Sequence, residues 1–331
     1  MILAGDIGGT KTILSLFKKA SDGSLLSIKE QTFPSSEFTT FEEILELFLR
    51  NQDTVSCACF GVAGPVINQN CQTTNLPWIL NGEQLKTQLN TQKVKLLNDL
   101  EAMALGMLHL QADDFIELNP NARTQSGNIA VIAAGTGLGE AILYWDGERY
   151  HTLATEGGHC DFAPLNEQQD KLLGYLRENF PAHVSYERIL SGSGFSNIYD
   201  FLVASNHAKP CPAVPPAKIA FSEGIDRSAV ISRLGIENEN ELCSKVVNLF
   251  VEIYGAEAGN LALKSLATGG VYIGGGIGPK IRSALETGSF ILAFTDKGRF
   301  QPLLETISVK LALNPRTPLL GAIHFYQGRG D

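Results

Sequence analysis

Long apolar runs are scarce in this sequence of 331 residues, because charges or glycines interrupt even the richest of them. None approaches the roughly 18 residues that a membrane-spanning helix needs. The first residues, MILAGDIGGTKT, also lack the basic segment and cleavage site of a secretory signal peptide. We therefore expect a cytoplasmic protein with no membrane partner.

Runs of lysine or arginine are missing as well, and 35 acidic residues outnumber 26 basic ones, which gives a formal charge of -9. A field of this sign does not favour a polyanion, so no nucleic-acid partner is expected. Charged residues make up only 18% and apolar residues 44% of the chain, whose length suits about two domains. The composition indicates a globular protein whose partner is a small molecule.

Paired C-x-x-C spacing is also absent. Six cysteines stand at positions 57, 59, 71, 160, 211 and 243, and this spacing favours reduced, buried thiols over disulfides. The neighbours His159 and Cys160 leave a zinc site open as the competing interpretation. No second ligand follows at a suitable spacing, so no zinc is expected.

Two parts of the chain open alike. An apolar strand over 2–7, a glycine-rich turn and a second strand over 12–17 are followed much later by strands over 129–134 and 141–145 around another glycine-rich turn. This repeat predicts two related α/β domains facing one another across a cleft. Further strands are expected over 24–33, 55–62, 93–97, 270–273 and 307–313, with a surface loop at 210–216 and helices that open at Thr40 and cover 166–179, 194–204, 226–234, 239–267 and 319–327.

The two glycine-rich turns suit phosphate contact. Glycine lets backbone N–H groups approach a phosphate closely, and a threonine hydroxyl adds a donor. Either turn alone could be a plain hairpin, but two in equivalent positions predict a phosphate clamp. Neither has the spacing of a P-loop or of a dinucleotide-binding fold. The predicted clamp consists of Gly5, Asp6, Gly8, Gly9 and Thr10 in the first turn, and Gly135, Thr136 and Gly137 in the second.

Carboxylates at strand ends are the next candidates. Asp6 suits Mg²⁺, held through water, because a carboxylate there is costly to bury without a cation or donors; a turn-stabilising interaction is the alternative. Asn98 and Asp99 end another strand, where Asp99 could also be a plain helix cap. The loop from Glu156 to His159 offers groups suited to sugar hydroxyls.

Three other segments carry weaker signals. Glu187, before a Ser-Gly pair, reads by itself as an ordinary helix end. Gly275 and Gly276 permit backbone approach to a flat ring, or form only a tight turn. The segment 294–300, FTDKGRF, is conspicuous but receives no catalytic role.

Taken together, the ordered motifs resemble the bacterial glucokinase family, within the superfamily of sugar kinases, heat-shock protein 70 and actin. They span nearly the whole chain: GDIGGT at 5–10, TNLPW at 74–78, LLND at 96–99, AAGTGLG at 133–139, EGGHCDFAP at 156–164, ERILSG at 187–192, GGVYIGGGI at 269–277 and FTDKGRF at 294–300.

The resemblance implies a fold and a reaction. The expected fold is α/β, with two ribonuclease H-like domains of the actin-like ATPase type around a central cleft: a smaller domain of 1–109 plus 312–331, and a larger one of 110–311. The expected reaction is ATP- and Mg²⁺-dependent phosphorylation of glucose at its 6-hydroxyl, for glycolysis, with a homodimer allowed for. Asp99 would be the catalytic base; Asn98, Glu156, His159, Glu187 and Asn75 would bind the sugar; the glycine turns with Lys11, Gly275 and Gly276 would bind ATP.

One position departs from the family pattern. Lys11 stands where Asn is expected, and the sister group of repressors and sugar kinases often has Lys there. That group's C-x-C-G zinc motif is absent, since Asp161 follows Cys160. A related hexose or N-acetylhexosamine kinase and a non-catalytic sugar sensor are the alternatives, and Lys11 leaves a polyphosphate donor open. A third rival, an actin-like or chaperone ATPase, would have no reason to place Asn98, Asp99, Glu156 and His159 together.

Overall fold

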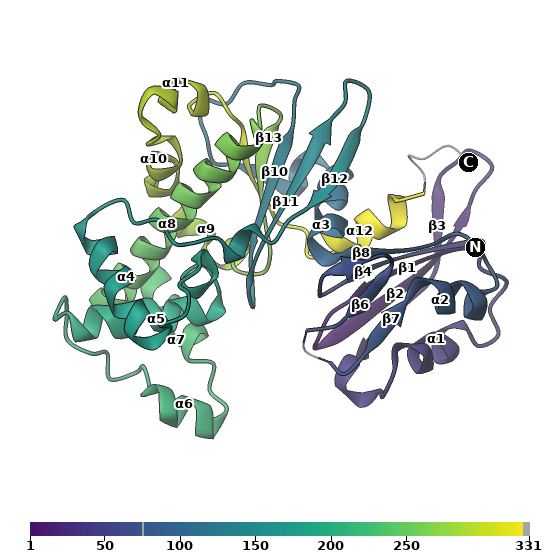
Figure 1. Cartoon of the computed structure of the whole chain (residues 1–331), viewed down its shortest axis with the longest axis horizontal. Coiled ribbons are helices and arrows are strands. Elements are labelled where there is room, and N and C mark those ends of the chain that lie inside the picture. The colour runs from purple at the N-terminus through teal and green to yellow at the C-terminus, as the bar shows by residue number, and fades with distance from the viewer. Residues whose placement is uncertain (75, 327–331) are drawn as a thin grey trace. The chain divides into compact units, whose positions relative to one another are not determined.

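The computed structural model describes residues 1–74 and 76–326 and divides into two compact units. Unit 1 comprises Met1–Ala112, Thr152–Ala154 and the described residues from Asn314 on, whereas unit 2 comprises Asp113–His151 and Thr155–Leu313. Figure 1 shows the chain, with elements of both units labelled where there is room.

The main sheet of unit 1 has five strands. They are β1 (Ile2–Ile7), β2 (Lys11–Lys19), β3 (Leu25–Pro34), β4 (Cys57–Val62) and β8 (Val94–Asn98), in the order β3-β2-β1-β4-β8. β1 pairs antiparallel with β2 and parallel with β4, and β4 pairs parallel with β8. A small second sheet consists of β5 (Val66–Ile67), β6 (Asn70–Gln72) and β7 (Ile79–Asn81).

Helices cover both faces of the main sheet of unit 1. Successive side chains of a strand point to opposite faces. Leu3 of β1 accordingly packs in one core with α1 (Phe41–Leu49) and α2 (Gly82–Leu89), whereas Ala4 packs in another with α3 (Asp99–Met107) and α12 (Thr317–His324). The short 3-10 helix η1 (Ser35–Glu37) follows β3.

Unit 2 is built on a six-stranded sheet covered by helices. Its strands are β9 (Phe115–Glu117), β10 (Ile129–Ala134), β11 (Leu138–Trp145), β12 (Tyr150–Ala154, whose last three residues are grouped with unit 1), β13 (Gly270–Gly274) and β14 (Val309–Ala312), in the order β12-β11-β10-β13-β14-β9. The longest helix, α8 (Glu241–Ser265), packs its apolar side chains into one large core with β10 and β13.

The remaining helices of the chain are shorter. The α-helices are α4 (Glu167–Asn179), α5 (Gly192–Ala204), α6 (Ala217–Glu223), α7 (Arg227–Ile236), α9 (Arg282–Leu285), α10 (Ser289–Thr295) and α11 (Gln301–Leu304), and the 3-10 helices are η2 (Ala112–Asp114), η3 (Gly157–His159), η4 (Tyr186–Arg188), η5 (Gly278–Ile281) and η6 (Gly298–Phe300).

The two sheets repeat one topology. In each sheet, the strand before the glycine turn, β1 or β10, lies between two neighbours. It pairs antiparallel with the strand after the turn, β2 or β11, and parallel with a later strand, β4 or β13. The order β3-β2-β1-β4-β8 in unit 1 thus matches β12-β11-β10-β13-β14 in unit 2. This is the ribonuclease H-like arrangement of the actin-like ATPases. The predicted fold class is therefore confirmed.

Most predicted elements occur with shifted ends. β1 and β10 have the predicted bounds, and α1 begins after Thr40, whose hydroxyl accepts from the Glu43 N–H. Other details differ. The predicted surface loop 210–216 buries Cys211 and Val214 in the core, and the last predicted helix residue, 327, lies outside the described part. The strands β5 to β7, β9 and β12 and the helices α6, α9, α10 and α11 were not predicted.

Candidate active site

The first glycine turn joins β1 to β2 and is tied to the segment after β3. Gly8 N donates to the Lys11 carbonyl at 3.0 Å. Ser35 is fully buried; its Oγ donates to the Gly8 carbonyl at 2.8 Å and its N–H to the Thr10 carbonyl at 3.0 Å. Ser35 therefore fixes the turn from behind. Sequence reasoning missed this residue, which lies 25 positions after Thr10.

Gly5 and Asp6 differ from the rest of that turn, because both lie within β1. A Cβ at Gly5 would lie 2.7 Å from the Phe60 ring and 2.8 Å from Leu14. The packing of these two side chains leaves no room for a side chain at Gly5. The Asp6 carboxyl is largely buried, and this burial raises its pKa to about 6, opposed by the nearby positive charge of Lys11. A cation beside Asp6 would stabilise its ionised form.

Asn98 and Asp99 stand where β8 passes into α3. Asn98 is the helix cap: its Oδ1 accepts from Leu100 N at 2.9 Å, and its Nδ2 donates to the Gly64 carbonyl at 3.1 Å. Asp99 is the first residue of the helix, not its cap, so the plain-cap interpretation of Asp99 is wrong. The N-terminal end of a helix favours a negative charge, so this position suits a carboxylate.

The second glycine turn joins β10 to β11 and touches Glu187. Gly135 N donates to the Gly137 carbonyl at 2.8 Å. Leu138 N donates to Glu187 Oε2 at 3.0 Å, and a Cβ at Gly137 would lie 2.4 Å from that oxygen. Gly135 instead has open space around its Cβ position. A side chain at Gly137 would therefore require the Glu187 carboxylate to move, whereas one at Gly135 would meet open space.

Glu187 also reaches the loop that follows β12. His159 Nε2 lies 4.0 Å from Glu187 Oε2, with side chains that are 57% and 28% exposed respectively. Glu156 is exposed and precedes η3, where its carbonyl accepts from His159 N at 3.0 Å. Three predicted residues of unit 2, Gly137, His159 and Glu187, thus meet at one place. Glu187 is not an ordinary helix end.

Two buried carboxyl groups lie under this loop, and neither was singled out from the sequence. Glu140 Oε2 would lie 2.0 Å from a Cβ at Gly157, and its Oε1 has no hydrogen-bond partner among the described residues. Fully buried Glu257 interacts with Glu140 and accepts from Lys264 and Asn260. Burial first, and then the charge of Glu257, raise the pKa of Glu140 to about 8. Glu140 is therefore a neutral acid near pH 7.

This raised pKa predicts a pH-dependent stability. The folded state holds a proton on Glu140 up to about pH 8, whereas the unfolded chain releases it near 4.5, so the stabilisation is complete below 4.5 and is lost as the pH rises through 8. The slope should reach about 1.4 kcal/mol per pH unit. Urea unfolding of the wild type and Glu140→Gln from pH 5 to 8 should show a flatter curve for the variant. Parallel curves would reject the raised pKa.

A cavity of about 500 Å³ lies beside the second turn, within unit 2. Gly192 and Ile277 are in its lining and are bonded to the turn: Gly192 N donates to the Gly135 carbonyl at 2.8 Å, and Ile277 N to the Ala134 carbonyl at 3.1 Å. Gly275 has a φ of +80° and no room for a Cβ, which would lie 2.3 Å from the Ala134 carbonyl. The cavity is further lined by Phe195, Asp226, Ser228, Ala229, Ser232, Arg233, Ile236, Glu237, Lys280 and Ile281.

This cavity can hold a flat ring with a phosphate chain. Apolar side chains such as Phe195 and Ile277 suit a ring, and Lys280 offers a cation. The N-terminus of the 13-residue helix α5 begins at Gly192, next to the turn, and favours an anion. Gly276, next in the chain, has open space around its Cβ position.

The described residues show neither a group of metal ligands nor a membrane-spanning helix. Within 1–74 and 76–326, no three His, Cys, Asp or Glu side chains are grouped so that they could hold a metal ion. No helix of that part is long and apolar enough to cross a membrane. Asn75, one of the predicted sugar residues, lies outside the described residues.

Known proteins resemble this chain over nearly its whole length. A family model described as Glucokinase matches residues 3–329. A glucokinase from Trichormus variabilis is 39% identical over 333 residues, which cover 97% of each chain. The crystal structure of a glucokinase from an Antarctic psychrotroph is 30% identical, covers 99% of both chains and has a TM-score of 0.82.

A more distant structure shares the fold. It is a ROK family glucokinase from Streptomyces griseus in complex with glucose and AMPPNP, with 19% identity, a TM-score of 0.63 and 99% of both chains covered. At this identity the likeness supports the actin-like fold alone.

Proposed function

Because this chain belongs to the glucokinase family, we propose that Asp99 of unit 1 and the loop from Glu156 to His159 of unit 2 serve one phosphoryl transfer. The chain is an ATP-dependent kinase that phosphorylates glucose, as its family membership across 97% of its length indicates. The acceptor is the 6-hydroxyl, and the product is glucose 6-phosphate.

One observation carries the placement of the sugar. Glu187 Oε2 accepts from Leu138 N, directly after the second glycine turn, and lies 4.0 Å from His159 Nε2. The residues proposed for the sugar therefore adjoin the turn proposed for the phosphates. A kinase needs this adjacency, because the hydroxyl must attack the terminal phosphorus of ATP.

Asp99 is the proposed general base. The sugar hydroxyl is a poor nucleophile near pH 7, and a carboxylate in hydrogen-bond reach accepts its proton as the new oxygen to phosphorus bond forms. The bond between the terminal phosphorus and the bridging oxygen breaks, and ADP leaves with the negative charge. The Asn98 side chain accepts from Leu100 N through Oδ1 and donates one N–H of Nδ2 to the Gly64 carbonyl. The second N–H of Nδ2 can still donate to the sugar.

For the nucleotide, we propose contributions from residues of both units, as the family resemblance implies. We assign the ring to the cavity beside Gly192 and the phosphates to the turns with Gly135, Thr136, Gly8, Gly9 and Thr10, helped by Lys11. Backbone N–H groups stabilise charge that develops on the phosphoryl oxygens. Gly5 faces the core, so its proposed part is indirect.

Asp6 is the proposed partner of Mg²⁺. Its buried carboxyl lacks sufficient compensation, as the raised pKa of about 6 indicates, and Mg²⁺ is commonly held by one or two carboxylates with waters and substrate phosphates. When bound, Mg²⁺ neutralises charge on the phosphates. A cytoplasmic location and a homodimer remain predictions.

Sugar recognition is tested by removing charge without removing shape. Glu156→Gln and Glu187→Gln should each raise the KM for glucose by about tenfold or more, because a charged acceptor that faces hydroxyls becomes a neutral one. The KM for ATP should stay nearly unchanged. Steady-state kinetics with each substrate varied in turn measures both constants.

The matched control is Glu167→Gln. Glu167 is an exposed glutamate in the first turn of α4, paired with Lys171 at 2.7 Å. Its loss should change neither constant. If Glu156→Gln or Glu187→Gln changed the KM for ATP and left the KM for glucose unchanged, these groups would belong to the nucleotide site and the sugar assignment would be wrong.

A further inference from the structure

Gln69 lies in the turn between β5 and β6 and has an unusual backbone conformation. Its φ is 60°, and that of the preceding Asn68 is 51°. Both values lie in the left-handed region that glycine adopts most easily. A long polar side chain thus stands where glycine would suit the backbone better, so the contacts of Gln69 must offset this strain.

Those contacts are made with the edge of the main sheet of unit 1. Gln69 Oε1 accepts from Leu96 N at 2.8 Å, and Gln69 Nε2 donates to the Leu96 carbonyl at 3.3 Å. β8 is the last strand of the order β3-β2-β1-β4-β8, and its outer edge presents N–H and C=O groups that require partners. The amide of Gln69 therefore replaces one residue of a further strand.

Leu96 lies two residues before Asn98 and three before Asp99. Asn98 Nδ2 in turn donates to the carbonyl of Gly64, which precedes β5. The segment around β5 thus contacts the end of β8 twice, at Leu96 and at Asn98. Both contacts act directly on the backbone and cap that place Asp99.

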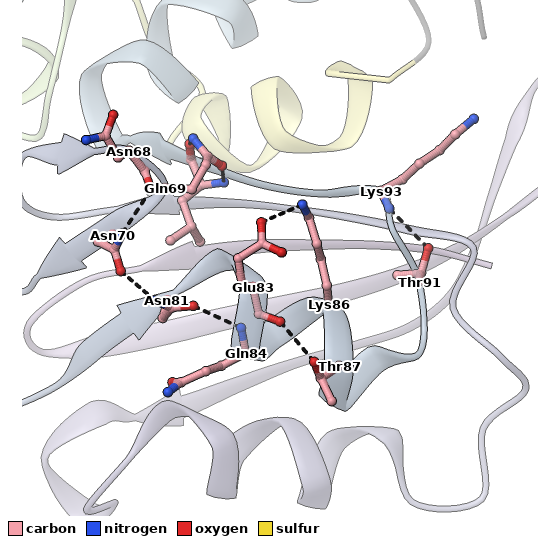
Figure 2. A network of polar contacts seen from close by, with 11 residues as sticks. Asn68, Gln69, Asn70, Asn81, Glu83, Gln84, Lys86, Thr87, Thr91 and Lys93 are labelled. Carbon is pink, nitrogen blue, oxygen red and sulfur yellow. Dashed lines mark hydrogen bonds and ion pairs between the residues drawn. The ribbon is translucent and has the colours of Figure 1, made fainter.

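Gln69 itself is held in place by a chain of polar contacts, shown in Figure 2. Asn70 Nδ2 donates to the Asn68 carbonyl at 2.9 Å, and Asn81 Nδ2 donates to Asn70 Oδ1 at 2.6 Å. Asn81 caps α2, where its Oδ1 accepts from Gln84 N at 2.9 Å. The turn that carries Gln69 is therefore anchored to the start of a helix.

We propose that Gln69 is a positioning residue for phosphoryl transfer, which holds Leu96 so that Asp99 stands at the correct distance from the sugar hydroxyl. The proposal rests on the proposed role of Asp99 as base. Gln69 touches neither substrate; it acts through the backbone of β8. Loss of its amide should therefore lower kcat and leave the KM for ATP unchanged.

The test begins with Gln69→Gly, because glycine accepts the φ of 60° and removes both bonds to Leu96 without adding strain. We expect kcat to fall about tenfold, since a small misplacement of a reacting group costs one to two orders of magnitude. The KM for ATP should be that of the wild type. Gln69→Glu, which keeps the acceptor for Leu96 N and loses the donor, should also lower kcat.

Gln84→Ala is the control, since the Gln84 side chain makes no hydrogen bond within the described residues and only its N–H joins the network. It should keep the wild-type kcat. A wild-type kcat in Gln69→Gly overturns the proposal, and so does a fall in kcat joined by a higher KM for ATP and a lower Tm, which indicates a general structural role.

Asp99→Asn measured in parallel separates the two hypotheses. Full turnover in that variant rejects Asp99 as base and with it the basis for Gln69. An inactive Asp99→Asn beside a fully active Gln69→Gly rejects the role of Gln69 alone.

Discussion

Asp99→Asn should lower turnover by roughly 10² or more, because removal of a general base commonly has an effect of this size. Asparagine keeps the shape of the side chain and its place at the start of α3 but cannot accept the proton of the sugar hydroxyl. Glucose affinity should fall far less, since binding does not require proton transfer. A coupled assay for ADP gives kcat, and calorimetry gives the Kd for glucose.

Asp170→Asn provides the comparison. Asp170 is an exposed aspartate in the first turn of α4, so like Asp99 it lies in the first turn of a helix, but it has no part in the proposed chemistry. Its turnover should be that of the wild type. Near-normal turnover in a folded Asp99→Asn protein would remove Asp99 from the mechanism and leave the base to be found elsewhere.

The sequence predicts the two hairpins well because their signals are local. In β1 and β10 an apolar strand ends at glycine and returns within a few residues, so the pattern is visible in a short window. The common topology of the two sheets extends this repeat to parallel strands, which pair across long stretches of chain. For those parallel pairings the sequence indicates which segments are strands but not which strands pair with one another.

The roles of the site residues could not come from spacing. Glu187 reads as a helix end until the fold brings it to Leu138 N, 49 positions earlier in the chain. The resemblance to a known family implies a role in sugar binding, and the structure shows the contact with Leu138 N. Asn98 shows the reverse: the motif indicated a sugar contact, and the structure adds a cap and a bond to Gly64.

The supporting residues were missed for two different physical reasons. Gln69 stands in a polar turn with no apolar alternation. Its side-chain amide bonds to the backbone of Leu96, 27 positions later, where a further strand would otherwise pair. Glu140 and Glu257 did leave a signal, because each interrupts an apolar run in β11 or α8. A charged residue in such a run is costly to bury and marks a special environment.

Gly137 offers the second large effect. A Cβ there would lie 2.4 Å from Glu187 Oε2, a separation that real Cβ atoms essentially never show. Gly137→Ala should therefore displace Glu187 from Leu138 N and from His159. We expect kcat/KM for glucose to fall by about 10², the scale of a misplaced binding group. The larger Gly137→Val should add a loss of ATP affinity, as contact between the turn and phosphate predicts.

Gly135→Ala separates packing from phosphate contact. The backbone of Gly135 does not require glycine, and its Cβ position is open, so alanine fits the protein itself. If phosphate approaches this turn, the added methyl group should raise the KM for ATP and leave Glu187 undisturbed. Steady-state kinetics should thus show a changed KM for glucose in Gly137→Ala and a changed KM for ATP in Gly135→Ala. A Gly137→Ala enzyme with an unchanged KM for glucose would show that Glu187 does not bind the sugar, since the added Cβ would lie 2.4 Å from Glu187 Oε2.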